Sequence, residues 1–442
     1  MAKTPAPAAV APAPAAQLAA APRGPLRVII DAEPVTLSPE GDAWGARIAR
    51  LTGDPMLPCE PDGRAAASLV SQTPAHLQLR PRAGVRPQEV AAALEGARVR
   101  LGSIDRVELL AGAVRIYLKR PDALLTGALC DLPVPGTGPF RLAAPLVRGR
   151  PLVLARARGA GVPTIVFSAE PDAPRALGRL RHGEADVLGR LPEAYWPEQA
   201  QGPATRRGFE AVRTGGVRLS YLVWNLRRPP ASELDVRSAL SEVLDREKLA
   251  RELHRGLAAP ATPGFALDPA DAAARLERAG WRDTGAVRTR QGRLLRVTLL
   301  ASSRGEHAGR LAAAWKEALA KLGVELVLQP ADGPGFAARL REGSFDVALV
   351  ERPTPPGRDL YALVGSHGAE NFGGLSSQKV DQAIFAWRGG SGDEAALWRA
   401  VLAEAALVPL FRHGEVALKS RALEGIRPAG DWLDLSAARW RP

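Results

Sequence analysis

Cysteine is nearly absent from this chain of 442 residues, which contains only Cys59 and Cys130. A disulfide scaffold or a protein with several zinc sites needs more cysteine, so both classes are excluded. Whether the two cysteines pair stays open. Long apolar runs are also missing, because the longest is far short of the ~18 residues that indicate a membrane-spanning helix. The sequence therefore excludes an integral membrane protein.

Lysine is scarce too, with 7 residues among the 59 Lys and Arg, although the formal net charge is +12. Such a charge can indicate an acidic partner, such as nucleic acid or an anionic membrane surface. The arginines are scattered among Asp and Glu, however, and together with abundant Ala, Gly and Pro they are what a GC-rich genome imposes. We predict no nucleic-acid partner.

Histidine occurs at six positions that are isolated from one another. No H-x-x-x-H pair occurs and neither cysteine has a second one nearby, so the usual spacing of metal ligands is absent. We predict that each histidine is a surface or capping residue, with no metal site and no cofactor. The histidines are His76, His182, His254, His307, His367 and His413.

Catalytic motifs are lacking as well, since no G-x-S-x-G elbow occurs. Ser376-x-x-Lys379 matches S-x-x-K without its companion motifs, so a capped helix start at Ser377 is the preferred interpretation. The segment 136–140 is glycine-rich, but Pro139 lacks the N–H that a phosphate cradle uses, which favours a tight turn entering a strand. The chain is predicted to be a binding protein rather than an enzyme.

The first 25 residues are almost entirely Ala and Pro. This composition favours an extended, disordered tail. Lys3 could serve the charged start of a signal peptide, but prolines interrupt the stretch where its apolar core should lie. No clear signal peptide is visible.

The clearest structural pattern lies at 295–350. Leu295–Leu300, Val324–Leu328 and Phe345–Val350 are predicted strands. Apolar residues within Glu306–Leu322 have the spacing of one helix face, and Gly335–Arg341 is a shorter helix. The order β-α-β-α-β is typical of a mostly parallel sheet covered by helices, so the predicted class is α/β.

Further elements are predicted from short patterns and capping residues. They are strands at Leu26–Ile30, His76–Leu79 and Val114–Leu118, and helices at Pro87–Ala97, from an Asp235 cap to about Arg255, from Asp268 to Gly280, and from Ser377 and Asp393 onward.

Several segments in order resemble family 5 of the extracytoplasmic solute-binding proteins, which serve peptide and nickel ABC importers. The strongest is YLVWN at 221–225 followed by 229–249, which is similar to a long ordered stretch of the family. The others are LRVIIDAEPVTLSP at 26–39, GTGPF at 136–140, RHGEADV at 181–187, FD at 345–346, ENFGG at 370–374 and VPLF at 408–411.

The resemblance implies a two-lobed periplasmic-binding-protein-like fold, with hinge-connected lobes and a ligand cleft between them. Lobe I would hold 26–216, with a reduced subdomain at about 46–125, and would regain 413–442 at the end. Lobe II would hold 217–412. The hinge crossings would fall near 214–222 and 408–414.

The resemblance also implies where a ligand would bind. The family's peptide binders carry a Trp and an Asp-Pro motif whose Asp holds the peptide ammonium, but this chain has neither in the loop 351–361. Arg352 and Arg358 would instead favour an anionic or neutral polar group, unless Glu351 or Asp359 replaces the missing acid. The expected ligand-binding residues are Trp44, Trp224, Asn225, Glu351, Arg352, Arg358, Tyr361, Asn371 and Phe372.

The resemblance thus implies the substrate-binding component of an ABC-type importer for a peptide-like or other small polar solute. Its partners would be that ligand and an ABC permease in the inner membrane, and it would act as a monomer. A periplasmic or extracytoplasmic location would follow. The alternative is a cytoplasmic ligand-sensing protein, or a degenerate interaction protein, on the same fold.

Overall fold

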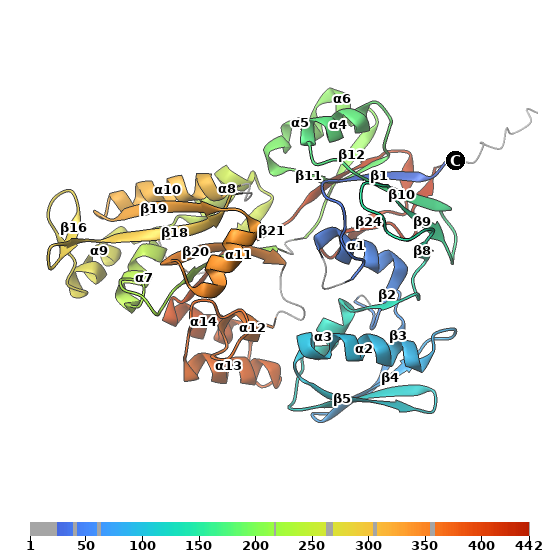
Figure 1. Cartoon of the computed structure of the whole chain (residues 1–442), viewed down its shortest axis with the longest axis horizontal. Coiled ribbons are helices and arrows are strands. Elements are labelled where there is room, and N and C mark those ends of the chain that lie inside the picture. Colours follow the sequence, from blue (N-terminus) through green and yellow to red (C-terminus); the bar gives the residue numbers. More distant parts are fainter. Residues whose placement is uncertain are drawn as a thin grey trace, which may run out of the picture.

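The computed structural model describes residues 24–38, 42–59, 63–215, 218–261, 268–303, 307–353 and 359–441. The predicted tail at 1–25 therefore lies almost wholly outside the described residues. Three sheet-based units dominate the rest, and Figure 1 separates them clearly. Within the described residues, no helix combines the length and the apolar character that crossing a bilayer requires.

The first unit, here called lobe I, surrounds a seven-stranded sheet in the order β12-β22-β11-β1-β10-β9-β8. Its first strand pairs in parallel with β10 and β11, while the outer pairs are antiparallel. The elements are β1 (Leu26–Ile30), α1 (Ala43–Thr52), β8 (Phe140–Leu142), β9 (Leu152–Arg156), β10 (Thr164–Ala169), α4 (Ala173–Arg181), β11 (Val187–Leu191), the 3-10 helix η1 (Glu193–Tyr195), α5 (Glu198–Gln201), α6 (Pro203–Arg206), β12 (Phe209–Arg213), β22 (Val416–Ser420), β23 (Leu423–Glu424), β24 (Arg427–Ala429), β25 (Trp432–Asp434) and β26 (Arg439–Trp440).

The second unit, here called the small domain, is a four-stranded antiparallel sheet, β3-β4-β6-β5, packed against α2. Its two cysteines are free, and the Cys59 thiol donates to the carbonyl of Cys130 at 3.0 Å. The elements are β2 (Gly53–Pro55), β3 (Ala67–Gln72), β4 (His76–Pro81), α2 (Pro87–Leu101), β5 (Ile104–Leu110), β6 (Ala113–Leu118), α3 (Leu125–Cys130) and β7 (Pro133–Pro135).

The third unit, here called lobe II, surrounds a six-stranded sheet in the order β14-β21-β13-β20-β18-β19. The elements are β13 (Arg218–Trp224), α7 (Leu234–Glu242), α8 (Arg246–His254), β14 (Ala258–Pro260), α9 (Pro269–Arg278), β15 (Arg282–Asp283), β16 (Arg288–Arg290), β17 (Arg293–Leu294), β18 (Arg296–Ser302), α10 (Ala308–Ala320), β19 (Glu325–Ala331), α11 (Gly333–Glu342), β20 (Val347–Pro353), α12 (Tyr361–Val364), α13 (Gln378–Arg388), α14 (Glu394–Glu404) and β21 (Leu407–His413).

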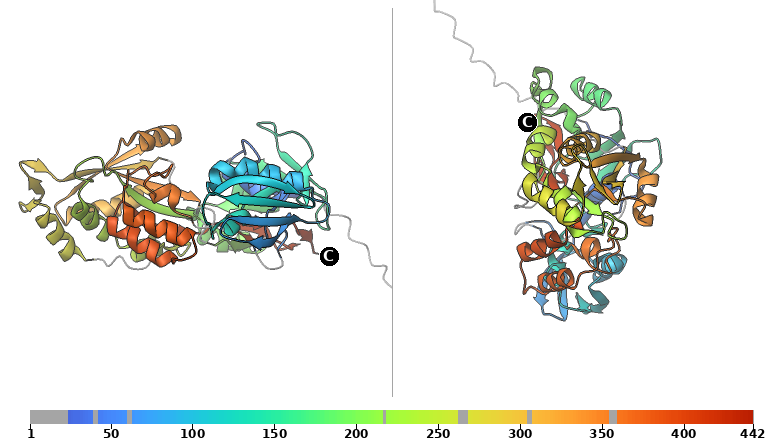
Figure 2. Two further views of the ribbon diagram at one scale, coloured as in Figure 1. Left: turned by 90° about the horizontal axis from the view of Figure 1, so that it is seen from below. Right: turned by 90° about the vertical axis from the view of Figure 1, so that its left-hand side faces the viewer.

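Helices cover both faces of the lobe II sheet, because its central strand is apolar on both sides. Along β13, Leu222 and Trp224 belong to the core beneath α7 to α10, whereas Tyr221 and Val223 belong to the core beneath α11 to α14. Successive side chains of a strand point to opposite faces, so this uninterrupted apolar run builds two cores. In Figures 1 and 2, α12 to α14 stand beside the small domain.

The predicted β-α-β-α-β pattern is confirmed, since β18 pairs in parallel with both β19 and β20. One helix prediction is wrong. The stretch from Asp235 to Arg255 forms two helices, and Asp235 lies in the first turn of α7, where Glu233 holds the capping position. The second helix begins at Asp245, whose side chain accepts a hydrogen bond from the backbone N–H of Lys248 at 2.9 Å.

The chain passes between the two large sheets twice. It leaves lobe I at the end of β12 to enter β13, and it returns from β21 to β22. A backbone hydrogen bond of 2.9 Å from Thr214 to Glu415 joins the two crossings. Both connections are therefore short and lie side by side, which is the geometry of a hinge.

The glycine-rich turn at 136–140 enters β8, as predicted. Gly136 has a positive φ of 79°, and Gly138 packs against the end of α1. A Cβ at Gly138 would lie 2.5 Å from the carbonyl carbon of Thr52 and 2.6 Å from the backbone nitrogen of Gly53. The turn therefore fixes how the small domain joins lobe I.

We expect Gly138→Ala to lower the free energy of unfolding by about 1–3 kcal/mol, because the backbone must shift to admit a methyl group. Urea denaturation measures it. The control is Gly96→Ala, where an added Cβ meets nothing within 4 Å on helix α2, and it should stabilise by about 0.5–1 kcal/mol. Equal effects of the two changes would contradict the packing role of Gly138.

Candidate functional site

A cavity of about 870 Å³ lies where lobe I, the small domain and lobe II meet. This volume is in the upper part of the ~300–1,000 Å³ range of small-molecule sites. Its walls carry many charges of both signs. The arginines are Arg50, Arg100, Arg120, Arg218, Arg352 and Arg388, and the acids are Asp122, Asp131, Asp359, Glu370 and Asp431.

On the lobe II wall, most charges are already matched in pairs. Arg352 forms an ion pair with Glu370, and Arg388 forms one with Asp359. Glu351 accepts from Arg218 at 2.8 Å. Burial alone would raise the pKa of Glu351, but the positive charges of Arg218 and His413 lower it. The acids of this wall therefore have cationic partners within the protein.

Arg120 differs from these arginines. It follows β6 of the small domain, and its guanidinium carbon lies 5.4 Å from the ring centre of Tyr361 and 4.9 Å from that of Phe385. Within the described residues, no carboxylate forms an ion pair with Arg120. The stack bridges the small domain and lobe II, and it leaves the N–H groups of a planar cation available to a ligand.

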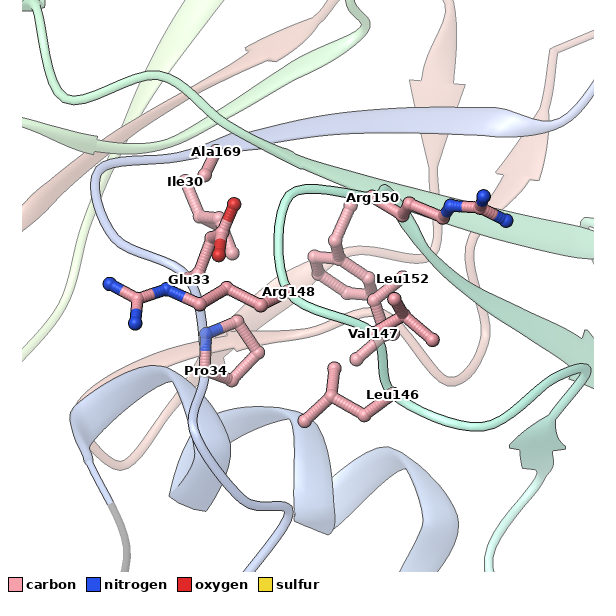
Figure 3. Close-up of a pocket in the computed structure, with 10 residues that line it drawn as sticks. Ile30, Glu33, Pro34, Leu146, Val147, Arg148, Arg150, Leu152 and Ala169 are labelled. Atoms are coloured by element: carbon pink, nitrogen blue, oxygen red, sulfur yellow. The ribbon is translucent and has the colours of Figure 1, made fainter.

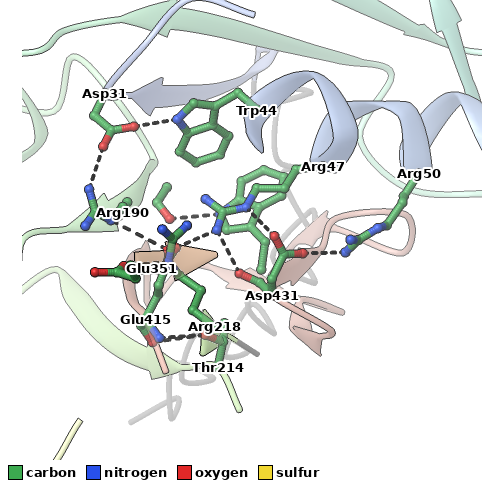
Figure 4. Close-up of polar contacts among 12 residues, drawn as sticks. Asp31, Trp44, Arg47, Arg50, Arg190, Thr214, Arg218, Glu351, Glu415 and Asp431 are labelled. Atoms are coloured by element: carbon green, nitrogen blue, oxygen red, sulfur yellow. Dashed lines mark hydrogen bonds and ion pairs between the residues drawn. The ribbon is translucent and has the colours of Figure 1, made fainter. Parts of the chain in front are cut away.

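The lobe I side is held by a network of charges centred on the buried pair Arg47 and Glu415, and Figure 4 shows it. Arg47 of α1 donates to Glu415 at 2.7 Å and to Asp431 at 3.0 Å, while Arg50 donates to Asp431 at 2.6 Å. Burial would raise the pKa of Asp431, but the two arginines lower it. The network ties α1 to the crossing that contains Glu415.

A second part of the network involves Asp31, at the end of β1. Its carboxylate accepts from the indole of Trp44 at 2.5 Å and from Arg190 at 3.0 Å. Burial would raise the pKa of Asp31, but these two donors lower it. Asp131 is different, because no ion pair joins it to another described residue. Burial, the largest influence, raises the pKa of Asp131, although the charge of Arg50 opposes this.

The chain matches a family model described as bacterial extracellular solute-binding proteins, family 5 Middle, over residues 109–372, more than half of its length. The chain belongs to this family. The resemblance noted in the sequence is confirmed, and the family is one of solute-binding proteins rather than enzymes.

Curated relatives of this solute-binding protein include the oligopeptide-binding protein OppA of Mycobacterium tuberculosis, 29% identical over 293 residues, with 60% of this chain and 48% of the relative covered. The oligopeptide-binding protein AppA of Bacillus subtilis is 24% identical over 227 residues, with 47% and 38% covered. The chain spans about half the length of the curated relatives it matches.

Solved structures show the same fold. NikA of Brucella suis in complex with Fe(III)-EDTA has a TM-score of 0.78 and 19% identity, with 95% of this chain and 100% of that chain covered. AppA of Bacillus subtilis in complex with a nonapeptide has a TM-score of 0.76 and 17% identity, with 95% and 99% covered. The predicted two-lobed periplasmic-binding-protein-like α/β class is confirmed.

The expected ligand-binding residues fall into different places in this solute-binding protein. Arg352 and Tyr361 line the cavity, whereas Glu351 does not line it and instead pairs with Arg218. Arg358 lies outside the described residues. Phe372 is half-buried against the core beneath α11 to α14.

Trp44, Trp224, Asn225 and Asn371 are not among the residues that line the cavity in this structure. Trp44 is 3% exposed and packs edge-on against Trp432, with ring centres 5.1 Å apart. Trp224 is fully enclosed and donates to the hydroxyl of Ser241 at 3.0 Å. Because side chains alternate between the two faces of β13, the indole of Trp224 points into the core beneath α7 to α10.

The two asparagines hold backbone groups rather than a ligand. The amide of Asn225, 1% exposed, donates to the carbonyls of Gly343 at 2.8 Å and Phe345 at 3.1 Å. The amide of Asn371 donates to the carbonyl of Leu375 at 2.7 Å and accepts from the N–H of that residue at 2.9 Å.

Sequence reasoning missed two features. Arg120 gave no signal, because its importance comes from aromatic partners more than 200 positions away. The prediction that every histidine is a surface or capping residue is wrong for His254 and His413, which are 2% and 5% exposed. Both lie near Glu193, and no local spacing could show this.

A second pocket, shown in Figure 3, lies between β1 and the loop 146–152. Glu33, Arg148 and Arg150 stand around it, but its volume is only about 20 Å³. That is room for little more than one water molecule, which excludes it as a solute site.

Because the amide of Asn225 satisfies two backbone carbonyls, we expect Asn225→Ala to lower the free energy of unfolding by about 1–3 kcal/mol. Urea denaturation measures the loss. The matched control is the exposed neighbour Arg228, whose change to alanine should have little effect. Unchanged stability of Asn225→Ala would show that the amide is not structural and would return it to the list of ligand contacts.

Proposed function

We propose that this protein is the substrate-binding component of an ABC-type importer and holds a peptide-like or other small polar solute in the 870 Å³ cavity. The observation that carries the proposal is that both lobes and the small domain line this cavity beside a double crossing of the chain. Hinge motion around such a crossing would enclose a ligand. Membership of the solute-binding family supports this function.

The same proposal includes the setting in which the protein works. A permease in the bacterial inner membrane would accept the ligand, and the protein would act outside the cytoplasm, most simply in the periplasm. Its family is one of extracellular solute-binding proteins. We also propose 26–216 with 413–442 as one hinged lobe, and 217–412 as the other.

For the ligand, we propose a solute with a carboxylate or similar anionic group that binds Arg120. Arg218, Arg352 and Arg388 each have an acidic partner. An anionic ligand at one of these three arginines would compete with its acidic partner. Arg120 instead stacks on the rings of Tyr361 and Phe385, so its N–H donors stay available to a ligand. Guanidinium groups match carboxylates in a bidentate geometry, and such charged hydrogen bonds are strong.

The lobe II loop supplies little for a peptide ammonium group. Glu351 and Asp359, the two acids that could replace the family's missing Asp, already pair with Arg218 and Arg388. A buried ammonium needs an anion of its own. The ring of Tyr361 already faces cations of the protein itself, since the guanidinium carbons of Arg388 and Arg120 lie 4.5 Å and 5.4 Å from its centre. The ligand site is thus proposed as Arg120, with Tyr361 and the Arg352–Glu370 pair as neighbouring parts of the cavity wall.

We expect Arg120→Ala to weaken binding of a carboxylate-bearing solute by about 1.5–3 kcal/mol, the contribution of a hydrogen bond to a charged group. Calorimetry with a panel of dipeptides, and with the same dipeptides amidated or N-acetylated, measures it. Amidation should cost more affinity than acetylation, and Arg120→Ala should abolish this difference.

The matched control is Arg106→Ala. Arg106 also stacks on a tyrosine, with its guanidinium carbon 3.5 Å from the ring centre of Tyr117, but it does not line the cavity. Its loss should leave affinity unchanged. Three results together would show that the anion proposal is wrong and that the site holds an ammonium group. They are loss of binding on acetylation, unchanged binding on amidation, and loss of affinity in Glu351→Gln.

Ligand closure gives a further test. A dipeptide that binds in calorimetry should reduce the radius of gyration in small-angle scattering while circular dichroism stays unchanged, because the lobes would move as bodies around the two crossings that contain Thr214 and Glu415. The control is the same scattering experiment with a solute that shows no heat of binding. Demonstrable binding without any compaction would contradict the hinge.

A further inference from the structure

Four side chains from four distant segments meet next to the hinge, outside the cavity. Glu193 begins η1 of lobe I, and His413 ends β21 at the second crossing. His254 ends α8 of lobe II, and His307 stands at the start of α10. None of the four lines the 870 Å³ cavity.

The carboxylate of Glu193 is the centre of this group. Its Oε2 lies 2.9 Å from Nδ1 of His254 and 2.7 Å from Nε2 of His307, and its Oε1 lies 3.9 Å from Nδ1 of His413. The ring centre of His254 lies 4.5 Å from those of both other histidines. One atom each from Glu193, His254 and His413 fall within 4.8 Å of one another.

The group is shielded from solvent. The side chains of His254 and His413 are 2% and 6% exposed, and those of Glu193 and His307 are both 13% exposed. Phe411 covers one side, with its ring centre 4.8 Å from that of His254. Burial would raise the pKa of Glu193, but hydrogen bonds with the three histidines lower it well below its usual range.

The donor set has a clear metal preference. Imidazole nitrogens with one carboxylate suit zinc and its neighbours in the transition series, whereas magnesium and calcium prefer oxygen ligands alone. Bonds of about 2.1 Å in a tetrahedral site place ligand atoms about 3.4 Å apart. The histidine nitrogens lie 2.7 to 3.9 Å from one or other carboxylate oxygen of Glu193, and the candidate ligand atoms of Glu193, His254 and His413 lie within 4.8 Å of one another, so small side-chain movements would bring them to that spacing.

An outer hydrogen bond supports the same interpretation. His413 directs Nδ1 toward Glu193, while its Nε2 lies 2.8 Å from the hydroxyl of Ser220. A metal-bound histidine commonly uses its second nitrogen in this way, which fixes the orientation of the ring.

We propose that Glu193, His254 and His413, with His307 as fourth ligand, bind a transition-metal dication of the zinc class between the two lobes beside the hinge. The metal would connect Glu193 of lobe I to three histidines on elements of lobe II. It would therefore act on the relative position of the lobes and not as a contact of the transported solute.

The test is a titration of the full, tag-free, metal-stripped protein with Co²⁺, followed by absorption, and with Zn²⁺, followed by calorimetry. We expect one equivalent of Co²⁺ to give the intense visible bands of a four-coordinate site, and Zn²⁺ to displace it. Glu193→Gln and His254→Gln should each weaken the affinity for Zn²⁺ about tenfold or more. Circular dichroism checks that both variants fold.

The matched control is His367→Gln, because His367 lines the solute cavity and belongs to no part of this cluster. Its affinity for Zn²⁺ should equal that of the unchanged protein. Absence of saturable binding of Co²⁺ and Zn²⁺ to the unchanged protein would overturn the proposal, and this measurement needs no variant. Loss of binding in His367→Gln, with retention in folded His254→Gln, would also overturn it and would place the metal in the cavity.

Discussion

The hinge region depends on the ion pair between the carboxylate of Glu415 and the guanidinium of Arg47. Glu415 is 8% exposed, and it sits at the second crossing of the chain, between β21 and β22. Burying a charge is costly unless it is paired, and Arg47 of α1 supplies the partner at 2.7 Å. Backbone and hydroxyl groups of Thr214, on the first crossing, form hydrogen bonds with the backbone of Glu415. One buried pair therefore joins both crossings to the helix that forms the cavity wall.

The arginine-rich composition takes on a specific meaning in this site. Most cavity arginines are matched with carboxylates, as Arg352 is with Glu370 and Arg50 with Asp431. Such pairs fix the shape of the walls and leave little net attraction for a charged ligand. Selectivity then falls to a cation held by aromatic rings, since stacking leaves its hydrogen-bond donors available. Arg120 is in that position because β6 ends opposite α12.

Local patterns predicted much of the fold and little of the site. The helix and strand periods at 295–350 and the caps at Asp268, Ser377 and Asp393 all appear in the structure, because each depends on neighbours a few residues away. The position of Trp224, in the core or in the cleft, could not be predicted from its sequence neighbours. An apolar run such as 221–224 predicts that both faces of β13 are buried, but not which face meets the cleft. The cluster around Glu193 joins segments up to 220 positions apart, so its histidines look isolated in the sequence.

The two proposed sites share one pair of neighbouring strands, β13 and β21. Arg218, at the start of β13, lines the cavity, and its register partner on β21 is His413 of the histidine cluster. A metal that connects Glu193 to His254 would stabilise one arrangement of the lobes. A solute that closes the cavity would also stabilise a particular arrangement of the lobes. Two ligands that each favour a particular arrangement change one another's affinity, and by thermodynamic linkage the effect is equal in both directions. The paired strands β13 and β21 supply a physical connection, because they hold one residue of each site in register.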